Sequence, residues 1–379
     1  MVCEPYVSNA LDLAALLSGD GRPLLQAQPG WRALAAHLPQ PVALDISLME
    51  RLARLERDQW VACDPDDPLL QALHACGLVL ASDDGRPCAE VDARLRSSHW
   101  CGLPALLWQQ SRWQGQDSVG ALAAAGMDRL DGLIACLGLP PESAAAGADS
   151  GIALPASTDT ALEALLRDRV TCRNFDPAGS VTLPQLAAVL WRTVAQRGTL
   201  DHPSGAGFAK KAVPSAGGLH PTEVYLLIRG VPGLDDGAYH YQPAGHRLLP
   251  HALSGDASVQ ARALRWLAGQ YWFADAPVLL VMASRQARLQ WKYREHGKAW
   301  RAAVLDVGHI SQALYMASTE LGLGAFVTAA INEVDVMQDL GLAAFTDEPL
   351  AIAGFGPRAA QRVIAELDPL GAIWPAAGH

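Results

Sequence analysis

The chain has 379 residues, half of them hydrophobic, and a formal net charge of -10. Its length exceeds that of a usual single domain and its apolar content is sufficient for buried cores, so we expect two folded domains. With only 29 Lys and Arg and no basic run, the composition argues against a surface that binds nucleic acid.

The N-terminus and the cysteines indicate a cellular compartment. Residues 1–5 read Met-Val-Cys-Glu-Pro, without the basic segment and apolar stretch of a secretory signal. No apolar run approaches the ~20 residues that span a bilayer, so we expect a cytoplasmic protein with no membrane segment. The seven cysteines lack the close ligand spacing of common zinc sites, and we expect free thiols and no metal.

The first predicted elements are two helices and a hairpin. Apolar residues recur at helical spacing over 46–55. A second helix is predicted with Asp67 as its N-cap residue and Pro68 at its first position, ending at Gly77. The apolar run and turn of residues 78–85 predict a strand that enters a hairpin. Two helices followed by a hairpin resemble a winged-helix module.

The predicted domain boundary is a segment rich in small residues. Residues 141–158 are rich in Ala, Ser, Pro and Gly and show neither helical nor strand periodicity, as expected of a linker. We therefore expect a smaller winged-helix-like N-terminal domain over 1–140 and a second domain over 159–379. Because the first domain lacks a basic recognition helix, it is expected to pack against the second domain or to bind a peptide by strand addition. A purely structural accessory domain is the alternative.

The second domain is predicted to be α+β. The predicted elements are strands over 224–228, 277–283 and 350–353, a hairpin of 239–241 with 247–249, and a long helix over 300–321. Gly322 is the expected helix stop. Since strand and helix do not alternate regularly, helices around a mainly antiparallel sheet fit better than a doubly wound fold.

Three polar residues at alternate positions form the first candidate motif. In an extended segment Arg169, Thr171 and Arg173 point to the same side. Arginine binds phosphate oxygens in a bidentate manner and a hydroxyl donates a further hydrogen bond, so the pattern suits a phosphate group. Two surface arginines paired with Asp168 and Asp176 would give the same pattern, and the motif alone leaves that alternative open.

A glycine-rich loop forms the second candidate motif. Pro214, Ser215, Ala216, Gly217 and Gly218 come shortly before a predicted strand. Glycine permits positive φ and lets the backbone approach a flat ligand closely, while the serine supplies a donor. A plain turn between a loop and a strand explains the segment equally well.

The order of the motifs resembles a known family. Arg-x-Thr-x-Arg, Pro-Ser-Ala-Gly-Gly followed by Glu-Val-Tyr-Leu, Tyr-His-Tyr, Lys-Tyr and Gly-His-Ile-Ser-Gln succeed one another within residues 160–358. This order is similar to that of the SagB-type oxidases of thiazole/oxazole-modified peptide biosynthesis, a branch of the FMN-dependent nitroreductase superfamily. The resemblance implies a nitroreductase-like FMN-binding domain over 159–379, and the N-terminal module resembles the peptide-clamp-type domains that such enzymes carry.

The resemblance also implies the residues that contact FMN. Those expected to hold the phosphate and ribityl chain or to line the ring are Arg169, Thr171, Arg173, Pro214, Ser215, Ala216, Gly217 and Gly218. Gly356 and Arg358 match a stretch that returns a backbone turn and a basic side chain to the same phosphate. Since the flavin of this superfamily lies at a homodimer interface, Gln312 and Gly324 are expected to contact the cofactor or the partner subunit.

Lys292 and Tyr293 match the Lys-Tyr pair of the azoline oxidases and are the expected catalytic residues. Oxidation of an azoline removes a carbon-bound proton and a hydride, so a base must act while the flavin accepts the hydride. Lysine serves as that base only if burial or nearby cations such as Arg288 and Arg294 lower its pKa from about 10.4. An exposed lysine on a charged helix is the alternative. His220, just after the glycine-rich loop, is a further catalytic candidate.

Three hypotheses for function follow. The first is an FMN-dependent dehydrogenase/oxidase of a ribosomally synthesised, post-translationally modified peptide, which oxidises azolines to azoles and is reoxidised by molecular oxygen. The second is an FMN- and NAD(P)H-dependent reductase of dehydroamino acids or of nitro or quinone compounds. The third is a non-catalytic peptide-binding scaffold of a maturation complex. The expected partners are the modified precursor peptide, a second copy of the chain in a homodimer, and other peptide-maturation enzymes.

Overall fold

The structure, a computed structural model, describes residues 1–11, 25–56, 59–62, 64–141, 152, 154–155 and 160–374. The predicted linker over 141–158 lies almost entirely outside these residues. The chain divides into two compact units, Met1–Arg112 with Tyr293–Gly297 and Trp113–Lys292 with Lys298–His379. Helices α6 (Ser118–Ala124) and α7 (Leu130–Leu137), which we expected in the first domain, therefore group with the second unit.

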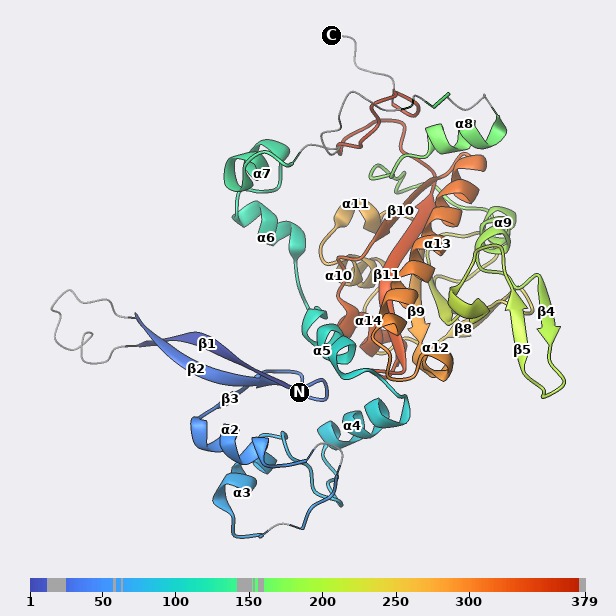
Figure 1. Ribbon diagram of the computed structural model, residues 1–379. Helices are drawn as coiled ribbons and strands as arrows, with labels where there is room; N and C mark the ends of the chain where they lie inside the picture. The colour runs from blue at the N-terminus through green and yellow to red at the C-terminus, as the bar shows by residue number, and fades with distance from the viewer. Residues whose placement is uncertain are drawn as a thin grey trace. The chain divides into compact units, whose positions relative to one another are not determined.

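In its described residues, the first unit combines a small antiparallel sheet with short helices (Figure 1). The strands are β1 (Val2–Leu11), β2 (Leu25–Leu34) and β3 (Val42–Leu44), paired in chain order. The helices are α2 (Ile46–Ala53), α3 (Pro68–Ala75), α4 (Pro87–Ser97) and α5 (Gly102–Ser111). Ala33 and Leu44 of the sheet pack with Leu73 of α3 in one buried cluster, so sheet and helices share a core.

The two predicted helices of this unit are confirmed, but the predicted hairpin is wrong. At the start of α3 the Asp67 side chain accepts hydrogen bonds from two backbone N–H groups. Residues 78–86 form no strand. Arg86 pairs with the buried Asp84 at 2.5 Å and also donates to the carbonyl of His74, so the segment is tied to α3 as a loop. Because the strands precede the helices, the structure does not support the winged-helix prediction.

The second unit is built on a six-stranded sheet in which every pairing is antiparallel. The strand order is β10–β11–β9–β6–β7–β8. The strands are β6 (Thr222–Ile228), β7 (Gly237–Gln242), β8 (Arg247–His251), β9 (Val278–Arg285), β10 (Gly324–Thr328) and β11 (Asp347–Gly356). A separate hairpin pairs β4 (Gly198–Asp201) with β5 (Gly207–Lys210). The predicted strands and the β7–β8 hairpin are confirmed.

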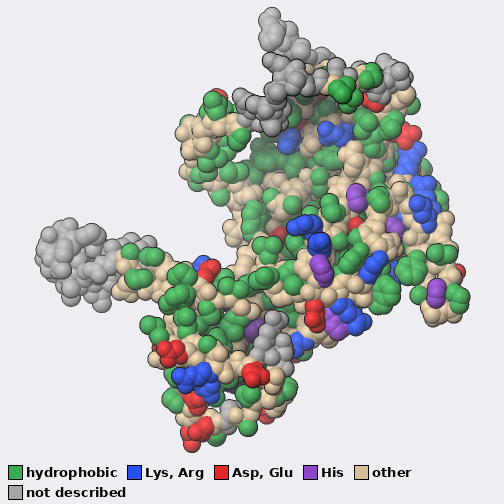
Figure 2. All heavy atoms as spheres, viewed as in Figure 1, with side chains coloured by type: hydrophobic (Ala, Val, Ile, Leu, Met, Phe, Trp, Pro, Cys, Tyr) green, Lys and Arg blue, Asp and Glu red, His purple; other side chains and the backbone are tan. Residues whose placement is uncertain are grey.

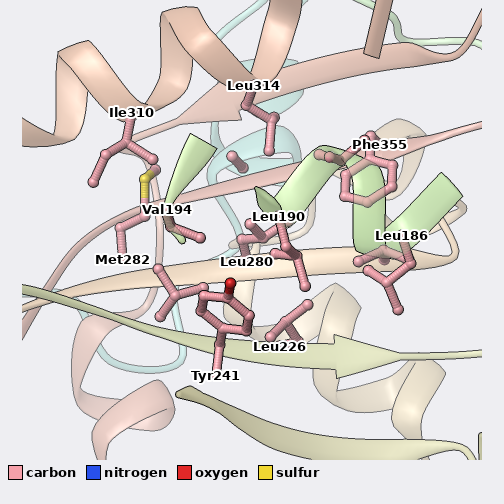
Figure 3. Close-up of a cluster of buried hydrophobic side chains, with 14 of the residues drawn as sticks. Leu186, Leu190, Val194, Leu226, Tyr241, Leu280, Met282, Ile310, Leu314 and Phe355 are labelled. Atoms are coloured by element: carbon pink, nitrogen blue, oxygen red, sulfur yellow. The ribbon is translucent and has the colours of Figure 1, made fainter. Parts of the chain in front are cut away.

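Helices cover both faces of this sheet, because successive side chains along each strand point to opposite sides. On one face, Leu226 and Leu280 pack with α9 (Leu183–Thr193) and α13 (Lys298–Glu320), as Figure 3 shows. On the other, Leu227 and Leu279 pack with α10 (Val259–Trp266), α11 (Tyr271–Ala274) and α14 (Glu333–Leu340). The α+β prediction is confirmed for this unit.

Helix α13 is the long helix predicted from the sequence, and it runs beside β10 and β11 (Figure 1). Gly322 follows its end with a φ of 71°, a conformation that favours glycine and stops the helix. None of the helices in the described part of the chain has both the length and the apolar character needed to cross a membrane.

The surface carries its charges in small groups. On the face shown in Figure 2, Lys and Arg side chains alternate with acidic and apolar ones and form no continuous basic band. Six described cysteines are free thiols, of which only Cys172 is buried. No cluster of three or more His, Cys, Asp or Glu within the described ranges is arranged to hold a metal ion.

Candidate functional site

The Arg-x-Thr-x-Arg segment lies in extended form beside β10. Thr171 forms a parallel bridge with Ala325, and the backbone N–H of Cys172 donates to the Ala325 carbonyl at 2.9 Å. Buried and half-buried side chains alternate along the segment: Val170, Cys172 and Asn174 are buried, whereas Arg169, Thr171 and Arg173 are half-buried. The three polar residues therefore share one side, as the alternation predicts.

The guanidinium groups of Arg169 and Arg173 have no carboxylate partner among the described residues. Arg169 lies over the Tyr315 ring, 5.4 Å from its centroid. Arg173 lies 6.0 Å from the centroid of Phe273. Stacking on a ring face orients a guanidinium but leaves N–H groups in its plane for an anion.

The alternative that paired these arginines with neighbouring aspartates is wrong. Asp168 pairs with Arg167 at 2.9 Å. Asp176 accepts the backbone N–H of Ala178 at 3.0 Å and closes a turn. The positive charge on this side of the segment is therefore not neutralised by either neighbour.

Arg358, the third arginine expected to bind the phosphate, is engaged within the protein. Its Nη1 donates to Oε2 of Glu366 at 3.0 Å, and its Nη2 donates to the Val170 carbonyl at 2.9 Å. Its side chain is 14% exposed. Arg358 thus has a carboxylate partner, unlike the other two arginines, and it braces the backbone beside them.

The glycine-rich loop is fastened to α13 by one carboxylate. Ser215 Oγ donates to Oδ2 of Asp306 at 2.5 Å, and the Ala216 N–H donates to Oδ1 at 3.1 Å. Burial raises the pKa of Asp306, while these two hydrogen bonds oppose the shift. The next two residues, Gly217 and Gly218, have φ values of 64° and 68°, and a side chain at Gly218 would meet open space. The loop is thus held at one end and open at the other.

Helix α13 contacts both the loop and the Arg-x-Thr-x-Arg segment. Asp306 holds the loop, and the Tyr315 hydroxyl lies 3.0 Å from Oγ1 of Thr171. Tyr315 follows Asp306 by about two and a half helical turns, or about 14 Å along the axis. Both residues are buried, and the half turn between them means that they project from different sides of α13. A single rigid element therefore sets the distance between the two motifs.

A small cavity of about 10 Å³ lies behind the loop. It is lined by Val194, Lys211, Val213, Pro214, Ser215, His220, Thr222, Asp306 and Ile310. Lys211 is only 7% exposed, and its ammonium forms no hydrogen bond or ion pair with a described residue. Burial lowers its pKa. Oγ1 of Thr222 is also buried without a hydrogen-bond partner in the described chain.

His220 closes the loop in a restricted conformation. Its φ is 47°, and its backbone N–H donates to Ser215 Oγ at 2.9 Å. Burial, reinforced by the positive charges of Lys211, Arg288 and Lys210, lowers the pKa of His220 to about 4. The imidazole is therefore neutral near pH 7.

The lowered pKa of His220 predicts acid sensitivity. Between about pH 6.5 and the folded pKa of about 4 the unfolded state binds more protons, so stability rises with pH in this window and is lost as pH falls through it. His220→Asn, which tolerates the positive φ, is expected to remove about 2 kcal/mol of the loss between pH 7 and 4.5. Urea unfolding at both pH values measures this. An identical pH dependence in the variant would contradict the shift.

The expected catalytic pair lies at the end of α12 (Gln286–Tyr293), where the chain passes from one compact unit to the other. Lys292 is exposed and Tyr293 is half-buried. Burial therefore does not activate Lys292, and its proposed role as base depends on neighbouring cations such as Arg288 and Arg294. The buried lysine of this unit is Lys211, which sequence reasoning missed because a Lys-Lys pair before a loop is typical of a solvated surface.

The remaining predicted contacts have ordinary structural surroundings. Gln312 is exposed on α13. Gly324 and Gly356 are partners across the β10–β11 pair. A side chain at Gly324 would overlap Cys172, and one at Gly356 would overlap Pro277, so close packing accounts for both glycines. Neither is needed for a turn.

Comparisons with known sequences identify the family of the second unit. Residues 166–357 match the model of the nitroreductase family. A candidate nitroreductase of Methanocaldococcus jannaschii is 31% identical over 192 residues, which cover 50% of this chain and 88% of the relative. The trifolitoxin-processing protein TfxB of Rhizobium leguminosarum biovar trifolii is 30% identical over 151 residues. That match spans 38% of either chain, well under two thirds of TfxB.

A solved structure extends the likeness of fold. A chain in the Escherichia coli microcin synthetase McbBCD complex, which contains bound truncated pro-MccB17, superposes with a TM-score of 0.52 at 18% identity. The match covers 70% of this chain and 97% of that one. The family match spans the Arg-x-Thr-x-Arg segment, the glycine-rich loop and helix α13. The chain belongs to the nitroreductase family, whose members are oxidoreductases that typically depend on FMN.

Proposed function

We propose that this chain binds FMN along α13, with the phosphate at Arg169 and Arg173 and the ring against the Pro214–Gly218 loop. The observation that carries the proposal is the pair of half-buried guanidinium groups without a carboxylate partner in the described chain. A phosphate supplies that partner through charge-assisted hydrogen bonds. The Thr171 hydroxyl adds a donor on the same side.

In this site Arg358 has a supporting role and does not bind the phosphate, whereas the Pro214–Gly218 loop keeps the role expected from the sequence. Arg358 supports the phosphate site from behind, because Glu366 already neutralises it. The loop residues have the positive φ and open space that a flat ring requires beside a backbone. The residues present therefore fit a flavin mononucleotide.

FMN, when bound, supplies the group that accepts or donates a hydride. Behind the loop, Lys211 is buried and forms no ion pair with a described residue, although the carboxylates of Glu223 and Asp306 act on it through space, so its side chain is placed to stabilise negative charge on a ring in front of it. His220 is neutral near pH 7, and its ring nitrogens have no hydrogen-bond partner among the described residues. It can therefore donate or accept a hydrogen bond at the loop.

We propose a modified peptide as the substrate, with azoline-to-azole oxidation as the reaction and molecular oxygen as the reoxidant. The relative named for trifolitoxin processing and the fold of a microcin synthetase chain support a role in peptide maturation. Lys292 stays the proposed base and Tyr293 the proposed proton relay. A homodimer, with Gln312 and Gly324 near the interface, and a complex with other maturation enzymes belong to the same proposal.

The second candidate is a reductase that takes hydride from NAD(P)H. The Methanocaldococcus jannaschii relative favours it, because most of that protein matches this chain. The two candidates differ in the direction of electron flow. Rapid oxidation of added NADPH in air indicates the reductase, whereas oxygen consumption that depends on a thiazoline-containing peptide indicates the oxidase.

The purified chain is expected to be yellow and to release FMN on denaturation. Lys292→Ala is expected to lower turnover of a thiazoline peptide at least about a hundredfold while leaving the flavin spectrum intact, since a general base contributes roughly 10²–10⁴-fold. Lys298→Ala is the matched control for loss of an exposed lysine. A loss of flavin in the Lys292 variant would make that residue structural, and a colourless protein that still binds a precursor peptide would favour the scaffold hypothesis.

A further inference from the structure

The chain that follows β11 returns to the Arg-x-Thr-x-Arg segment. Residues 359–374 form no helix or strand. They nevertheless bury the side chain of Glu366 completely, at 0% exposure. A fully buried carboxylate is costly unless several donors surround it. The hydrogen-bond donors around Glu366 therefore identify the residues that this carboxylate holds in place.

Five donors converge on this one carboxylate. Oε1 accepts the backbone N–H of Arg173 at 2.5 Å, the backbone N–H of Asn174 at 3.0 Å and the Asn174 side-chain amide at 2.9 Å. Oε2 accepts Arg358 Nη1 at 3.0 Å and the Trp374 indole N–H at 2.6 Å. Although burial raises it, these hydrogen bonds bring the pKa of Glu366 below its usual value. The group is ionised near neutral pH.

Through these bonds Glu366 reaches both ends of the segment. At one end it binds the backbone of Arg173 directly. At the other it orients Arg358, whose Nη2 holds the Val170 carbonyl between Arg169 and Thr171. The positions of both unpaired arginines thus depend on a carboxylate that lies behind them.

We propose that Glu366 is a positioning residue, which holds Arg169 and Arg173 in the geometry that binds the FMN phosphate. The inference rests on the proposed FMN function. Glu366 acts through the backbone and through Arg358. It also neutralises Arg358, so that the net positive charge of the site belongs to the two arginines that face outward.

The Glu366→Gln variant distinguishes positioning from charge, because loss of positioning raises the Kd for FMN whereas loss of the negative charge lowers it. Removal of a negative charge behind a phosphate site favours the phosphate and lowers the Kd for FMN. Glutamine has one acceptor oxygen where the carboxylate has two, so in either orientation its NH2 group faces donors that it cannot accept, and the segment loosens. We expect the Kd for FMN to rise at least about tenfold, since several hydrogen bonds are lost or weakened. Quenching of FMN fluorescence on titration measures it.

Asp339→Asn is the matched control for loss of stability. Asp339 is a buried carboxylate of the same unit that pairs with Arg262 and Arg265, away from the segment. The Asp339→Asn variant is expected to lower the thermal midpoint of unfolding without changing the Kd for FMN. An equal rise in Kd for both variants would assign the effect to general destabilisation and overturn the inference.

Trp374→Phe provides a test that does not alter a buried charge. It removes one donor to Glu366, and we expect a Kd for FMN about threefold higher than that of the wild type. If Glu366→Gln fails to fold, this variant decides: a higher Kd supports positioning and an unchanged Kd overturns it. An unchanged or lower Kd in Glu366→Gln overturns the inference but leaves the FMN site in place. If the wild-type chain binds no FMN, both the proposed FMN site and the positioning role of Glu366 are wrong.

Discussion

Replacing Arg169 and Arg173 together with alanine is expected to weaken FMN binding by at least about a hundredfold and to give a colourless protein. Each guanidinium has no carboxylate partner in the described chain, so a bound phosphate is its natural counter-ion. Charge-assisted hydrogen bonds contribute about 1.5–3 kcal/mol each, and two such groups account for a loss of that size. Flavin content after purification and titration with FMN measure it.

Two further variants make the result specific. Arg192→Ala removes an exposed arginine that pairs with Glu320 in the same unit, and it is expected to leave the Kd for FMN unchanged. Arg169→Lys with Arg173→Lys keeps the charge but loses bidentate geometry and ring stacking, and an intermediate affinity is expected. If the double alanine variant kept its full flavin content, the phosphate would lie elsewhere and the proposed site would be wrong.

Asp306→Ala is expected to have the second largest effect, on both stability and FMN binding. Its carboxylate accepts Ser215 Oγ and the Ala216 N–H, and its loss leaves two partly buried donors unsatisfied, at about 1–3 kcal/mol each. Because burial raises the pKa of Asp306, removal of the buried charge offsets part of that cost. We expect a net loss of about 2 kcal/mol in unfolding free energy and at least about tenfold weaker FMN binding.

Ser215→Ala is the matched control for this prediction. It removes one of the two hydrogen bonds to Asp306 and also the acceptor of the His220 N–H, but leaves the backbone bond from Ala216, so a loss in stability close to that of Asp306→Ala is expected. Urea unfolding and FMN titration on the same samples measure both quantities. If Asp306→Ala lost stability but bound FMN as tightly as the wild type, the loop would have no part in holding the ring.

Local patterns in the sequence predicted the elements that hold the site. Alternation placed Arg169, Thr171 and Arg173 on one side of an extended segment, and the structure has them there. The helical repeat over 300–321 predicted α13. In place of the hairpin predicted at 78–85, the segment is a loop in which Arg86 pairs with Asp84 and donates to the His74 carbonyl of α3. Side-chain bonds of this kind leave no periodicity to detect.

The residues that support the site were missed for a related reason. Lys211 stands in a Lys-Lys pair, Asp306 and Glu366 are isolated charged residues, and each of the three is typical of a solvated surface. In the structure they are buried, and Glu366 contacts a residue 193 positions away. No local signal marks a contact over such a separation.

By itself the sequence determined the α+β class of the second unit, its antiparallel strands and its long helix, and it identified the two motifs on which the FMN proposal depends. These features follow from backbone geometry. Side-chain direction repeats every two residues in a strand and every 3.6 in a helix, so the pattern can be detected in a short stretch of sequence. Only the tertiary structure decided that Arg169 and Arg173 have no carboxylate partner among the described residues while Arg358 has one, because charge compensation is a property of groups close in space. Only it placed a buried lysine behind the loop and a buried glutamate behind the arginines, since desolvation depends on what the rest of the chain packs around a side chain.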